Sequence, residues 1–449
     1  MSHALTPPPR RAVAASAPVL PLVAVVALAG LPPVGDGAGP ADVVSALAVG
    51  YCVIRLLRER RRPLSPRAAV VLGLPVVGLA LAAMGAASPQ AAFGGLGRYL
   101  QVFVLVPAAV LVLLRGRACF RALAWSFVGL ALWQGSVGVY QYVTGTGASY
   151  QGETVRAVGT FGATDVMGMA TAVSLGLVCA AGIALGRGPV RQRTAAAGCA
   201  LVLVLPLALS FSRGAWIATA LACAVQLVLA GLRRALKVAA AVVAAGVVLV
   251  GGFGVGTAML QERIGSITEV ADAPDQSVVD RYTLWAAATD MWREHPWTGV
   301  GLKNFPEYRD GHATLALSSG SDIAGAGSEY HKQALLSPHS MYLLVLSEQG
   351  LIGLTALAGS WLALLVCALR RLPRARRRGP GPDCALVAVG LLLWQLTDFF
   401  YGDIGGPSTV LTGVALGLTA WWALSRDDRA DAAPRRDGAP ARIEEASTR

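Results

Sequence analysis

The chain has 449 residues, of which 55% are hydrophobic and only 14% are charged. Because soluble proteins carry about 25% charged residues, this composition excludes a soluble enzyme, a secreted disulfide scaffold and a disordered chain. The formal net charge of +12 does not indicate nucleic-acid binding, because membrane proteins collect Lys and Arg in their cytoplasmic loops.

Apolar runs long enough to cross a bilayer recur along the chain and predict an all-α polytopic membrane protein with about twelve transmembrane helices. The runs cover 12–34, 40–57, 68–87, 98–114, 119–143, 163–186, 194–211, 214–232, 236–260, 339–369, 384–402 and 406–424. The cysteines lie in or beside these runs without a close CxxC pair, so neither a metal site nor a disulfide framework is expected.

Positive charge alternates between successive connections and predicts the orientation of the protein in the membrane. The arginine-rich segments are 55–67, 115–121, 187–193, 233–237 and 370–378. They alternate with short connections that hold only Arg98, Arg156 or Arg213. The positive-inside rule therefore places both termini in the cytoplasm and these short connections on the outer face of the plasma membrane.

This topology divides the chain into four parts. We expect an N-terminal bundle of about nine spans over 1–260, one large extracytoplasmic loop over 261–338, C-terminal transmembrane helices over 339–424, and a disordered cytoplasmic tail over 425–449. Connections as long as the loop are usually functional.

Within the loop, Ser277 and Asp280 are expected to cap a surface helix in which apolar residues repeat at helical spacing. Those residues are Leu284, Trp285, Ala288, Met291 and Trp292. The stretch 295–301 has the Pro and Gly pattern of a tight turn, and 311–334 is rich in Gly, Ser and Ala and is expected to be mobile.

The connection between the seventh and eighth spans is the first candidate for chemistry. It reads Ser-Phe-Ser-Arg-Gly-Ala-Trp over 210–216, which fixes Arg213 at the outer interface. A guanidinium presents a planar fork of donors to phosphate oxygens, and the hydroxyls of Ser210 and Ser212 add donors. The alternative is a snorkelling arginine that only marks a helix end.

The second and third candidates lie in and after the large loop. Arg281 opens the expected surface helix, where free N–H groups would reinforce an anion site, although it could instead be solvated or paired with Asp280. His339 stands where the chain re-enters the membrane. The ordinary histidine pKa of about 6.5 suits proton transfer, but a histidine at an interface can also be a hydrogen-bonded structural residue.

These segments, in this order and at these topological positions, resemble the O-antigen ligase and O-antigen polymerase family of bacterial envelope glycosyltransferases. The resemblance covers roughly 160–424 and includes the Ser-x-Ser-Arg-Gly-x-Trp turn at 210–216, the Arg281 helix, the His-Pro-Trp-Thr-Gly-Val-Gly-x-x-Asn-Phe stretch at 295–305 and the run from 339 to 353. The family often has Asn after the histidine, whereas this chain has Ser340.

The resemblance implies transfer of a glycan from an undecaprenyl-pyrophosphate carrier to an acceptor hydroxyl of a glycan, lipid or protein, without a metal or other cofactor. Arg213 and Arg281, with Ser210 and Ser212, would bind the pyrophosphate, and His339 would act as general base. Additional substrate contacts are expected from Tyr282, Trp285, Trp297, Asn304 and Glu348. Ligase and polymerase activity both remain open, because they differ only in the acceptor.

A multispan transporter or a flippase for lipid-linked glycan is the alternative. Transporters tend to place ionisable residues near the middle of the membrane. Glu348 is expected inside a span, about 13 Å below His339 at 1.5 Å per residue. The remaining intramembrane candidates are expected near span ends, which favours the enzyme; they are Asp42, Arg98, Asp165 and Asp398.

Overall fold

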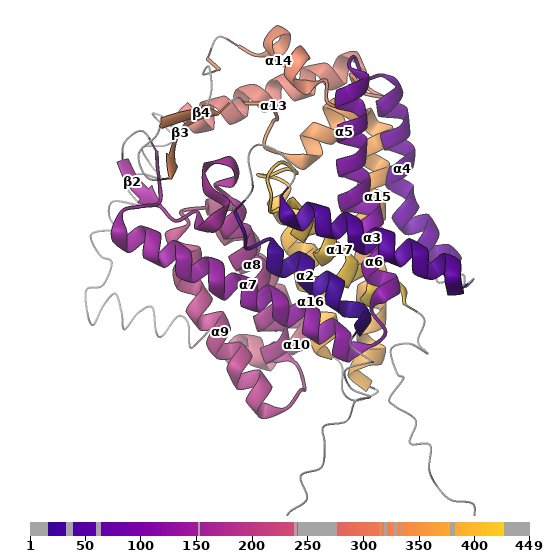
Figure 1. Cartoon of the computed structure of the whole chain (residues 1–449), viewed down its shortest axis with the longest axis vertical. Coiled ribbons are helices and arrows are strands. Elements are labelled where there is room, and N and C mark those ends of the chain that lie inside the picture. Colours follow the sequence, from indigo (N-terminus) through magenta and orange to yellow (C-terminus); the bar gives the residue numbers. More distant parts are fainter. Residues whose placement is uncertain are drawn as a thin grey trace, which may run out of the picture.

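The computed structural model describes residues 17–32, 39–59, 64–150, 153–237, 240, 276–314, 316–317, 321–326, 330–333, 335–377 and 382–425. These residues form a helical bundle with one small β-sheet (Figure 1). In chain order the elements are η1 Ala17–Val19, α2 Leu20–Leu28, α3 Pro40–Glu59, α4 Pro66–Met84, α5 Pro89–Leu100, η2 Gln101–Leu105, α6 Val106–Leu113, α7 Arg117–Thr144, β1 Ala148–Tyr150, β2 Glu153–Arg156, η3 Gly159–Asp165, α8 Gly168–Leu185, α9 Val190–Leu209, α10 Arg213–Ala230, α13 Gln276–Glu294, α14 Phe305–His312, β3 Ser321–Ala326, β4 Tyr330–Gln333, α15 Met341–Arg377, α16 Pro382–Asp398 and α17 Thr409–Leu424.

Eight helices in the described part of the chain are long and apolar enough to cross a membrane, so the chain is a multi-pass membrane protein. They are Pro40–Glu59, Pro66–Met84, Pro89–Leu113, Arg117–Thr144, Gly168–Leu185, Val190–Leu209, Arg213–Ala230 and Met341–Pro373. The expected count of twelve is not reached among these residues. The first, eleventh and twelfth runs form α2, α16 and α17, with 9, 17 and 16 helical residues, and most of the ninth run lies outside the described residues.

Serine caps and prolines decide where several helices begin. Ser65, Ser88 and Ser212 accept hydrogen bonds from backbone N–H groups of the first turns of α4, α5 and α10. Proline follows the first two of these caps. Proline is favoured there because the first N–H groups of a helix have no partner within it.

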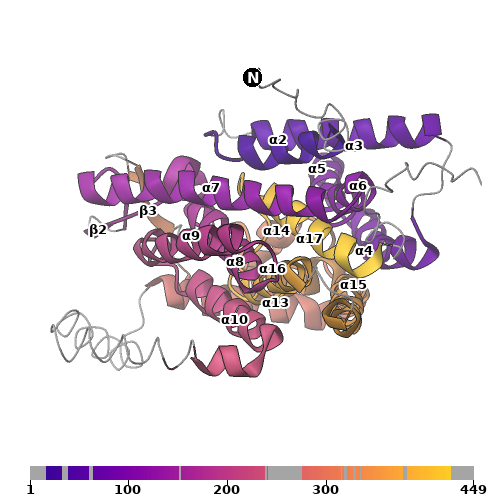
Figure 2. The same cartoon turned by 90° about the horizontal axis from the view of Figure 1, so that it is seen from below.

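The bundle is built around α8, α16 and α17, whose residues are mostly buried. Figure 2 shows α2 and α3 on one side of these helices and α10 on the other. The buried hydrophobic cluster joins residues of the first helices to residues of the last, for example Val110 of α6 to Val414 of α17. Membrane helices from both halves of the sequence therefore share one core.

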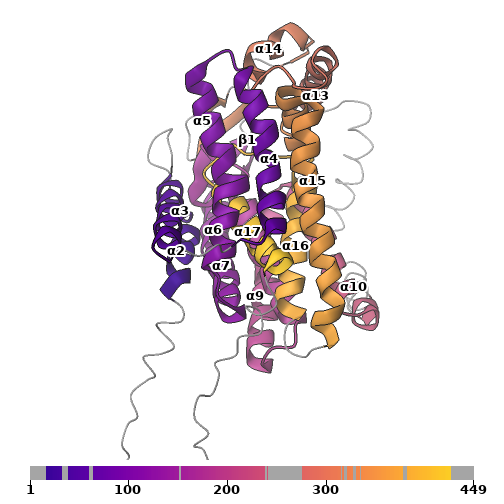
Figure 3. The same ribbon diagram turned by 90° about the vertical axis from the view of Figure 1, so that its right-hand side faces the viewer.

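Helices α4, α5 and α15 run side by side, and α13 and α14 lie beyond one of their ends (Figure 3). Gly78 and Gly353 bring α4 and α15 together so closely that a Cβ on Gly78 would overlap the backbone of Gly353. Small residues permit such close approach between membrane helices.

The helix α15 is broken at Gly350 and folds back on itself. Gly350 has φ 64° and ψ −164°, a conformation that interrupts the helix. The rings of Tyr342 and Trp361 lie 6.1 Å apart, although a straight helix would separate them by about 28 Å at 1.5 Å per residue. The arm 341–349 therefore runs antiparallel to the longer arm that follows, and the expectation of one straight span over 339–369 is wrong.

The stretch 295–301 forms the tight turn that its Pro and Gly pattern predicted, and this turn packs against the break in α15. Leu351 and Ile352 donate backbone hydrogen bonds to the carbonyls of Pro296 and Trp297 at 2.9 and 3.2 Å. Gly299 and Gly301 have φ values of 68° and 103°. The turn thus supplies partners for N–H groups that the helix break leaves open.

The surface helix α13 begins at Gln276, earlier than expected, so Ser277 and Asp280 lie within it and do not cap it. Its predicted apolar face is confirmed at Leu284, Ala288 and Met291, which are completely buried. These residues pack in a second hydrophobic cluster with Val300, Phe305, Leu335 and Leu344.

Two antiparallel β-strands, β3 and β4, lie within the stretch 311–334, which the sequence predicted to be mobile. β3 also pairs with β1, which connects to β2, so the strand order is β2-β1-β3-β4. The sheet joins the connection after α7 to the segment after α14.

Candidate active site

The connection between α16 and α17, residues 399–408, lies at the centre of the candidate site. It is fixed to the start of α15, because Met341 N donates to the carbonyls of Phe399 and Gly402 at 3.0 and 2.9 Å. The Ser340 hydroxyl donates to the Phe399 carbonyl as well, at 3.4 Å. Ser340 therefore helps to hold the connection beside His339.

His339 is half-buried at the start of the short α15 arm and adopts a left-handed backbone conformation with φ 49°. Such conformations are strained in residues other than glycine and occur often at functional sites. The preceding carbonyl, of Pro338, accepts a hydrogen bond from Trp285 Nε1 of α13 at 2.9 Å. The contacts on both sides of His339 thus fix its position.

Three charged residues interact electrostatically with His339. Burial lowers the pKa of His339, the carboxylate of Asp403 opposes this effect, Arg281 adds to it, and Asp280 opposes it more weakly. A lowered pKa keeps the imidazole neutral and able to accept a proton.

Arg281 is half-buried in the second turn of α13. Its position excludes the contribution of a helix N-terminus that the sequence suggested. Burial lowers the pKa of the guanidinium, and Tyr401 and Asp403 counteract that shift. An arginine nevertheless keeps its charge at any physiological pH.

Arg213 is the first residue of α10 and is exposed. The turn before it is strained at Phe211, with φ 50°, and is held by Arg156 of β2, which donates to the Phe211 carbonyl at 3.4 Å. Ser210 and Ser212 are buried, and their hydroxyls form hydrogen bonds within the turn and the helix cap. These two serines therefore stabilise the turn, and their expected phosphate contacts stay a prediction.

Tyr401 connects the two arginine-bearing helices. A Cβ on Gly214 of α10 would lie 3.3 Å from Cβ of Tyr401. On the other side, the rings of Tyr401 and Trp285 of α13 are 6.4 Å apart. The turn at 210–216, the helix α13 and the start of α15, which are far apart in sequence, thus meet around the 399–403 segment.

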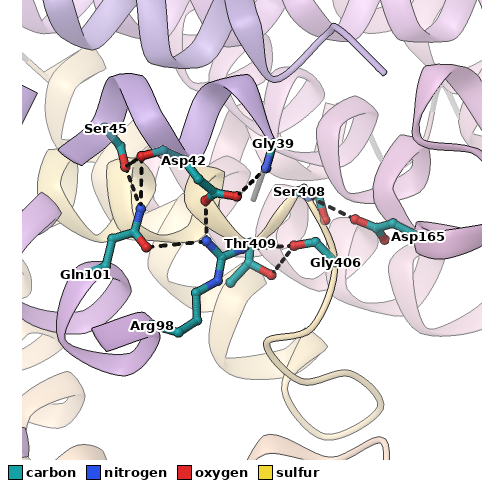
Figure 4. Close-up of polar contacts among 9 residues, drawn as sticks. All are labelled: Gly39, Asp42, Ser45, Arg98, Gln101, Asp165, Gly406, Ser408 and Thr409. Carbon is teal, nitrogen blue, oxygen red and sulfur yellow. Dashed lines mark hydrogen bonds and ion pairs between the residues drawn. The ribbon is translucent and has the colours of Figure 1, made fainter. Parts of the chain in front are cut away.

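A network of polar side chains fixes the far end of the same connection (Figure 4). Arg98 of α5 forms an ion pair with Asp42 of α3 and donates to the Gly406 carbonyl at 3.1 Å. Asp165 accepts a hydrogen bond from the backbone N–H of Ser408 at 2.9 Å. Burial raises the pKa of Asp165, while the hydrogen bonds from Ser408 and the charge of Arg98 oppose the shift.

Two expectations about ionisable residues need correction. Arg98 lies well inside a span, because the span begins at Pro89 and not near Arg98. The short arm of α15 leads from His339 toward the α14 end of the bundle, so Glu348 lies toward that end and not below His339 as expected. Glu348 Oε1 accepts a hydrogen bond from the N–H of Phe305 at 3.3 Å. The position of ionisable residues therefore separates an enzyme from a transporter less clearly than the sequence suggested.

The remaining predicted contacts differ in their surroundings. Tyr282 and Trp297 are exposed, by 63% and 65%, and both are available to a ligand. Asn304 is buried and donates to the carbonyls of Gly85 and Val300 while accepting from the N–H of Ala87. Asn304 is thus occupied in joining the α4–α5 connection to the loop, and its predicted role in binding substrate has no support from these contacts.

Asp403 and Tyr401 were not predicted as site residues. Asp403 interacts electrostatically with both His339 and Arg281, and its buried Oδ2 has no hydrogen-bond partner among the described residues. The signal in the sequence was a short connection that reads Asp-Phe-Phe-Tyr-Gly-Asp over 398–403, where polar and aromatic residues interrupt two apolar runs.

Comparison with protein families confirms the resemblance. Residues 197–358 match the Wzy_C family, described as O-antigen ligase. The matched segment contains Arg213, Arg281 and His339, so the chain carries an O-antigen ligase family domain over these residues. A comparison with curated proteins found no match.

Proposed function

We propose that this membrane protein transfers a glycan from an undecaprenyl-pyrophosphate carrier to an acceptor hydroxyl at the outer face of the plasma membrane. The observation that carries the proposal is the convergence of Arg281, His339 and Asp403 beside the α10 end that bears Arg213. The matched family domain, which contains three of these four residues, supports the class of substrate.

In the proposed reaction the acceptor oxygen forms a bond to the anomeric carbon of the donor glycan while the bond from that carbon to the pyrophosphate breaks. His339 accepts the hydroxyl proton, and the bonding electron pair leaves with the pyrophosphate. Arg213 and Arg281 stabilise the charge that develops on the phosphate oxygens. The proposal assigns this role to the arginines and not to a metal ion.

Asp403 would stabilise the protonated form of His339 after it has accepted the proton. A carboxylate near an imidazole favours the charged imidazolium. This is the electrostatic part of the role that an acidic residue has beside a catalytic histidine in many enzymes.

The orientation of the protein is part of the proposal: both termini cytoplasmic, about twelve spans, and a large extracytoplasmic loop over 261–338. Contacts between the arginine-rich connections support it. Trp421 donates to the carbonyl of Leu114, Arg121 pairs with Asp383, and Arg371 donates to the carbonyl of Ser425. These connections thus meet at one end of the bundle, which the positive-inside rule assigns to the cytoplasm.

The test is reconstitution of the purified protein in vesicles that contain an undecaprenyl-pyrophosphate-linked glycan and an acceptor glycan. Formation of the longer glycan with release of undecaprenyl pyrophosphate supports the proposal. Movement of the lipid-linked glycan between leaflets without a new glycosidic bond would instead support a flippase.

Ligase and polymerase activity can be separated in a deletion strain by mass spectrometry of lipid-linked and finished glycans. Accumulation of single lipid-linked units would indicate a polymerase. Accumulation of long lipid-linked chains would indicate a ligase.

A further inference from the structure

A group of buried polar atoms without partners lies next to the proposed catalytic site. Tyr99 of α5 and Glu348 of the short α15 arm are each only 1% exposed. Tyr99 Oη, Glu348 Oε2 and Asp403 Oδ2 have no hydrogen-bond partner among the residues that the structure describes. Buried polar groups are nearly always hydrogen-bonded, so each of these atoms requires a partner that the described chain does not provide.

These three residues belong to one electrostatic group. Tyr99 interacts with both Glu348 and Asp403, and Glu348 interacts with Asp403. Asp403 also interacts with His339 and Arg281. Asp403 is therefore shared between the proposed catalytic site and this group.

Lys303 extends into the same group from the turn before α14. Its Nζ lies 5.9 Å from the centre of the Tyr99 ring, and its charge interacts with Glu348. The backbone of Lys303 has φ 64°, a strained conformation for lysine. A Cβ on Gly95 would lie 2.7 Å from Cγ of Lys303, so glycine at this position leaves room for the lysine side chain.

We propose that Tyr99, Lys303, Glu348 and Asp403 form the subsite that binds the acceptor, and that this acceptor is a neutral, polyhydroxylated glycan. This assignment rests on the proposed function and names the acceptor class for it. Sugar hydroxyls can donate to the carboxylate oxygens and accept from Lys303. The acidic groups of Glu348 and Asp403 face one ammonium, so the group has no excess positive charge to attract an anionic acceptor, which favours a neutral one.

The charges also separate this subsite from the donor site. The two arginines attract the pyrophosphate, whereas the carboxylate of Asp403 repels it. His339 interacts with Asp403 and with Arg281, so a hydroxyl bound at Asp403 would be close to the base while the donor is held by the arginines. A proton could then pass from the acceptor to His339 as the glycosidic bond forms.

The test uses the purified protein in lipid nanodiscs and two probes. The first is a neutral oligosaccharide, released by mild acid from the surface polysaccharide of the same cells. The second is the same oligosaccharide with its primary alcohols oxidised to carboxylates. The variants are Tyr99→Phe and Glu348→Gln, which keep side-chain shape, and the matched controls are Tyr140→Phe on α7 and Glu307→Gln on α14, both at exposed positions.

We expect Tyr99→Phe to raise the acceptor KM about 2- to 10-fold, the loss typical of one hydrogen bond, and Glu348→Gln to raise it more. Donor Kd should not change, and the controls should match the original protein. Glu348→Gln should also reduce the preference for the neutral probe over the oxidised one. An unchanged acceptor KM in both variants, or an equal change in donor Kd, would overturn the subsite and leave water or purely structural contacts as the partners of these atoms.

Direct binding of the neutral probe, followed by saturation-transfer NMR, separates this inference from the proposed function. If the original protein binds the probe but forms no product with any donor, the proposed function fails and the subsite stands. If it forms product while the two variants bind the probe as well as the original protein does, the proposed function stands and the subsite fails.

Discussion

The two proposed phosphate ligands have different surroundings, and their substitutions should test the site independently. Arg213 is exposed at the start of α10, whereas Arg281 is half-buried beside His339. We expect Arg213→Ala and Arg281→Ala each to abolish transfer while membrane insertion persists. Arg213→Lys should also be poor, because an ammonium cannot reproduce the two parallel hydrogen bonds of a guanidinium.

The measurement is transfer in vesicles supplied with the lipid-linked donor. Arg293→Ala is a suitable control, because Arg293 lies on α13 with Arg281 but is exposed and pairs with Asp290 three residues before it. Near-normal transfer by Arg213→Ala or by Arg281→Ala would show that the substituted arginine does not belong to the site.

His339→Ala should reduce the transfer step about 10²- to 10⁴-fold, the usual contribution of acid–base catalysis, while donor binding survives. Single-turnover transfer and donor affinity measured on the same purified variant separate catalysis from folding. His312→Ala provides the control, because His312 lies on α14 and hydrogen-bonds to the Tyr308 carbonyl of its own helix. A His339 variant that loses donor affinity but transfers bound donor normally would indicate a structural histidine.

The pH dependence follows from the groups around the same imidazole. Activity should fall as pH decreases through the pKa of His339, because the protonated ring cannot accept a proton. Burial lowers this pKa, so the fall should occur below the value of about 6.5 that is typical of an exposed histidine. Asp403 and Asp280 raise the pKa while Arg281 lowers it.

Asp403 makes the largest contribution that raises the pKa of His339. Asp403→Asn removes this contribution and should lower the pKa of His339 further. The acid limb of the pH–rate profile should therefore move to lower pH. Asp290→Asn, an exposed substitution on α13, should leave the profile unchanged. An acid limb in the same place in Asp403→Asn would show that Asp403 does not act on the pKa of His339.

The arginines and the histidine could be predicted from the sequence because each stands in a short motif next to an apolar run. Asp403 could not, because its importance depends on the fold of α15 and α13 around the 399–403 segment. The expected position of Arg281 at the N-terminus of its helix was wrong, since Arg281 lies in the second turn of α13. A motif can thus point to a residue whose local structure differs from the one expected.

At the scale of elements, the break in α15 decides where the site lies. The sequence predicted one span over 339–369, because apolar residues continue through the break and a glycine inside an apolar run does not by itself reveal a reversal of direction. The reversal depends on Gly350 meeting the turn at 296–301. Without the reversal, Tyr342 and Trp361 would lie about 28 Å apart along one straight helix.

Gly350→Ala should therefore destabilise the protein by about 2 kcal/mol or more, because alanine disfavours a positive φ. The new Cβ would also overlap the Trp297 backbone. Thermal unfolding in detergent measures the loss. Gly359→Ala in the long arm is the matched control, because its Cβ would meet only Leu74 at an ordinary 3.5 Å. Equal melting temperatures for the two variants would contradict the described break.

The Arg98–Asp42 ion pair also acts between elements, because it links α3 and α5 to the 399–408 connection. The side chains are 23% and 9% exposed, and removing one partner of a largely buried pair costs about 3–5 kcal/mol. Arg98→Ala should therefore lower both stability and transfer. Arg98→Lys should recover part of the stability but less of the activity, because a single ammonium cannot easily reach both Asp42 and the Gly406 carbonyl.

Arg55→Ala provides the control for that substitution. Arg55 pairs with Glu59, one turn later on α3, and Glu59 is 40% exposed. Pairs of this kind contribute about 0.3–0.5 kcal/mol. A loss in Arg98→Ala no greater than in Arg55→Ala would show that the network in Figure 4 does not hold the connection.

At the scale of the whole molecule, composition was sufficient to predict a helical membrane protein, and the periodicity of charge was sufficient to group the connections. Span count was less predictable. The helices α16 and α17 are shorter than a full span, with 17 and 16 residues, because polar residues of the site interrupt the apolar sequence between them. Hydropathy alone did not distinguish such short helices from complete spans.

The orientation of the molecule in the membrane can be tested by cysteine labelling. Glu307 on α14 and Arg187 after α8 are both exposed. Helix α14 lies at one end of the bundle (Figure 1), whereas Gly186, next to Arg187, lies close to Asp383, the partner of Arg121. The native cysteines are all buried or half-buried, so they should contribute only a low background. We expect Glu307→Cys to react with a membrane-impermeant maleimide in intact cells and Arg187→Cys to react only after permeabilisation. The reverse pattern would place Arg213, Arg281 and His339 on the cytoplasmic side. A glycan transferase for the cell surface could not work in that orientation, because its acceptor would lie across the membrane from His339.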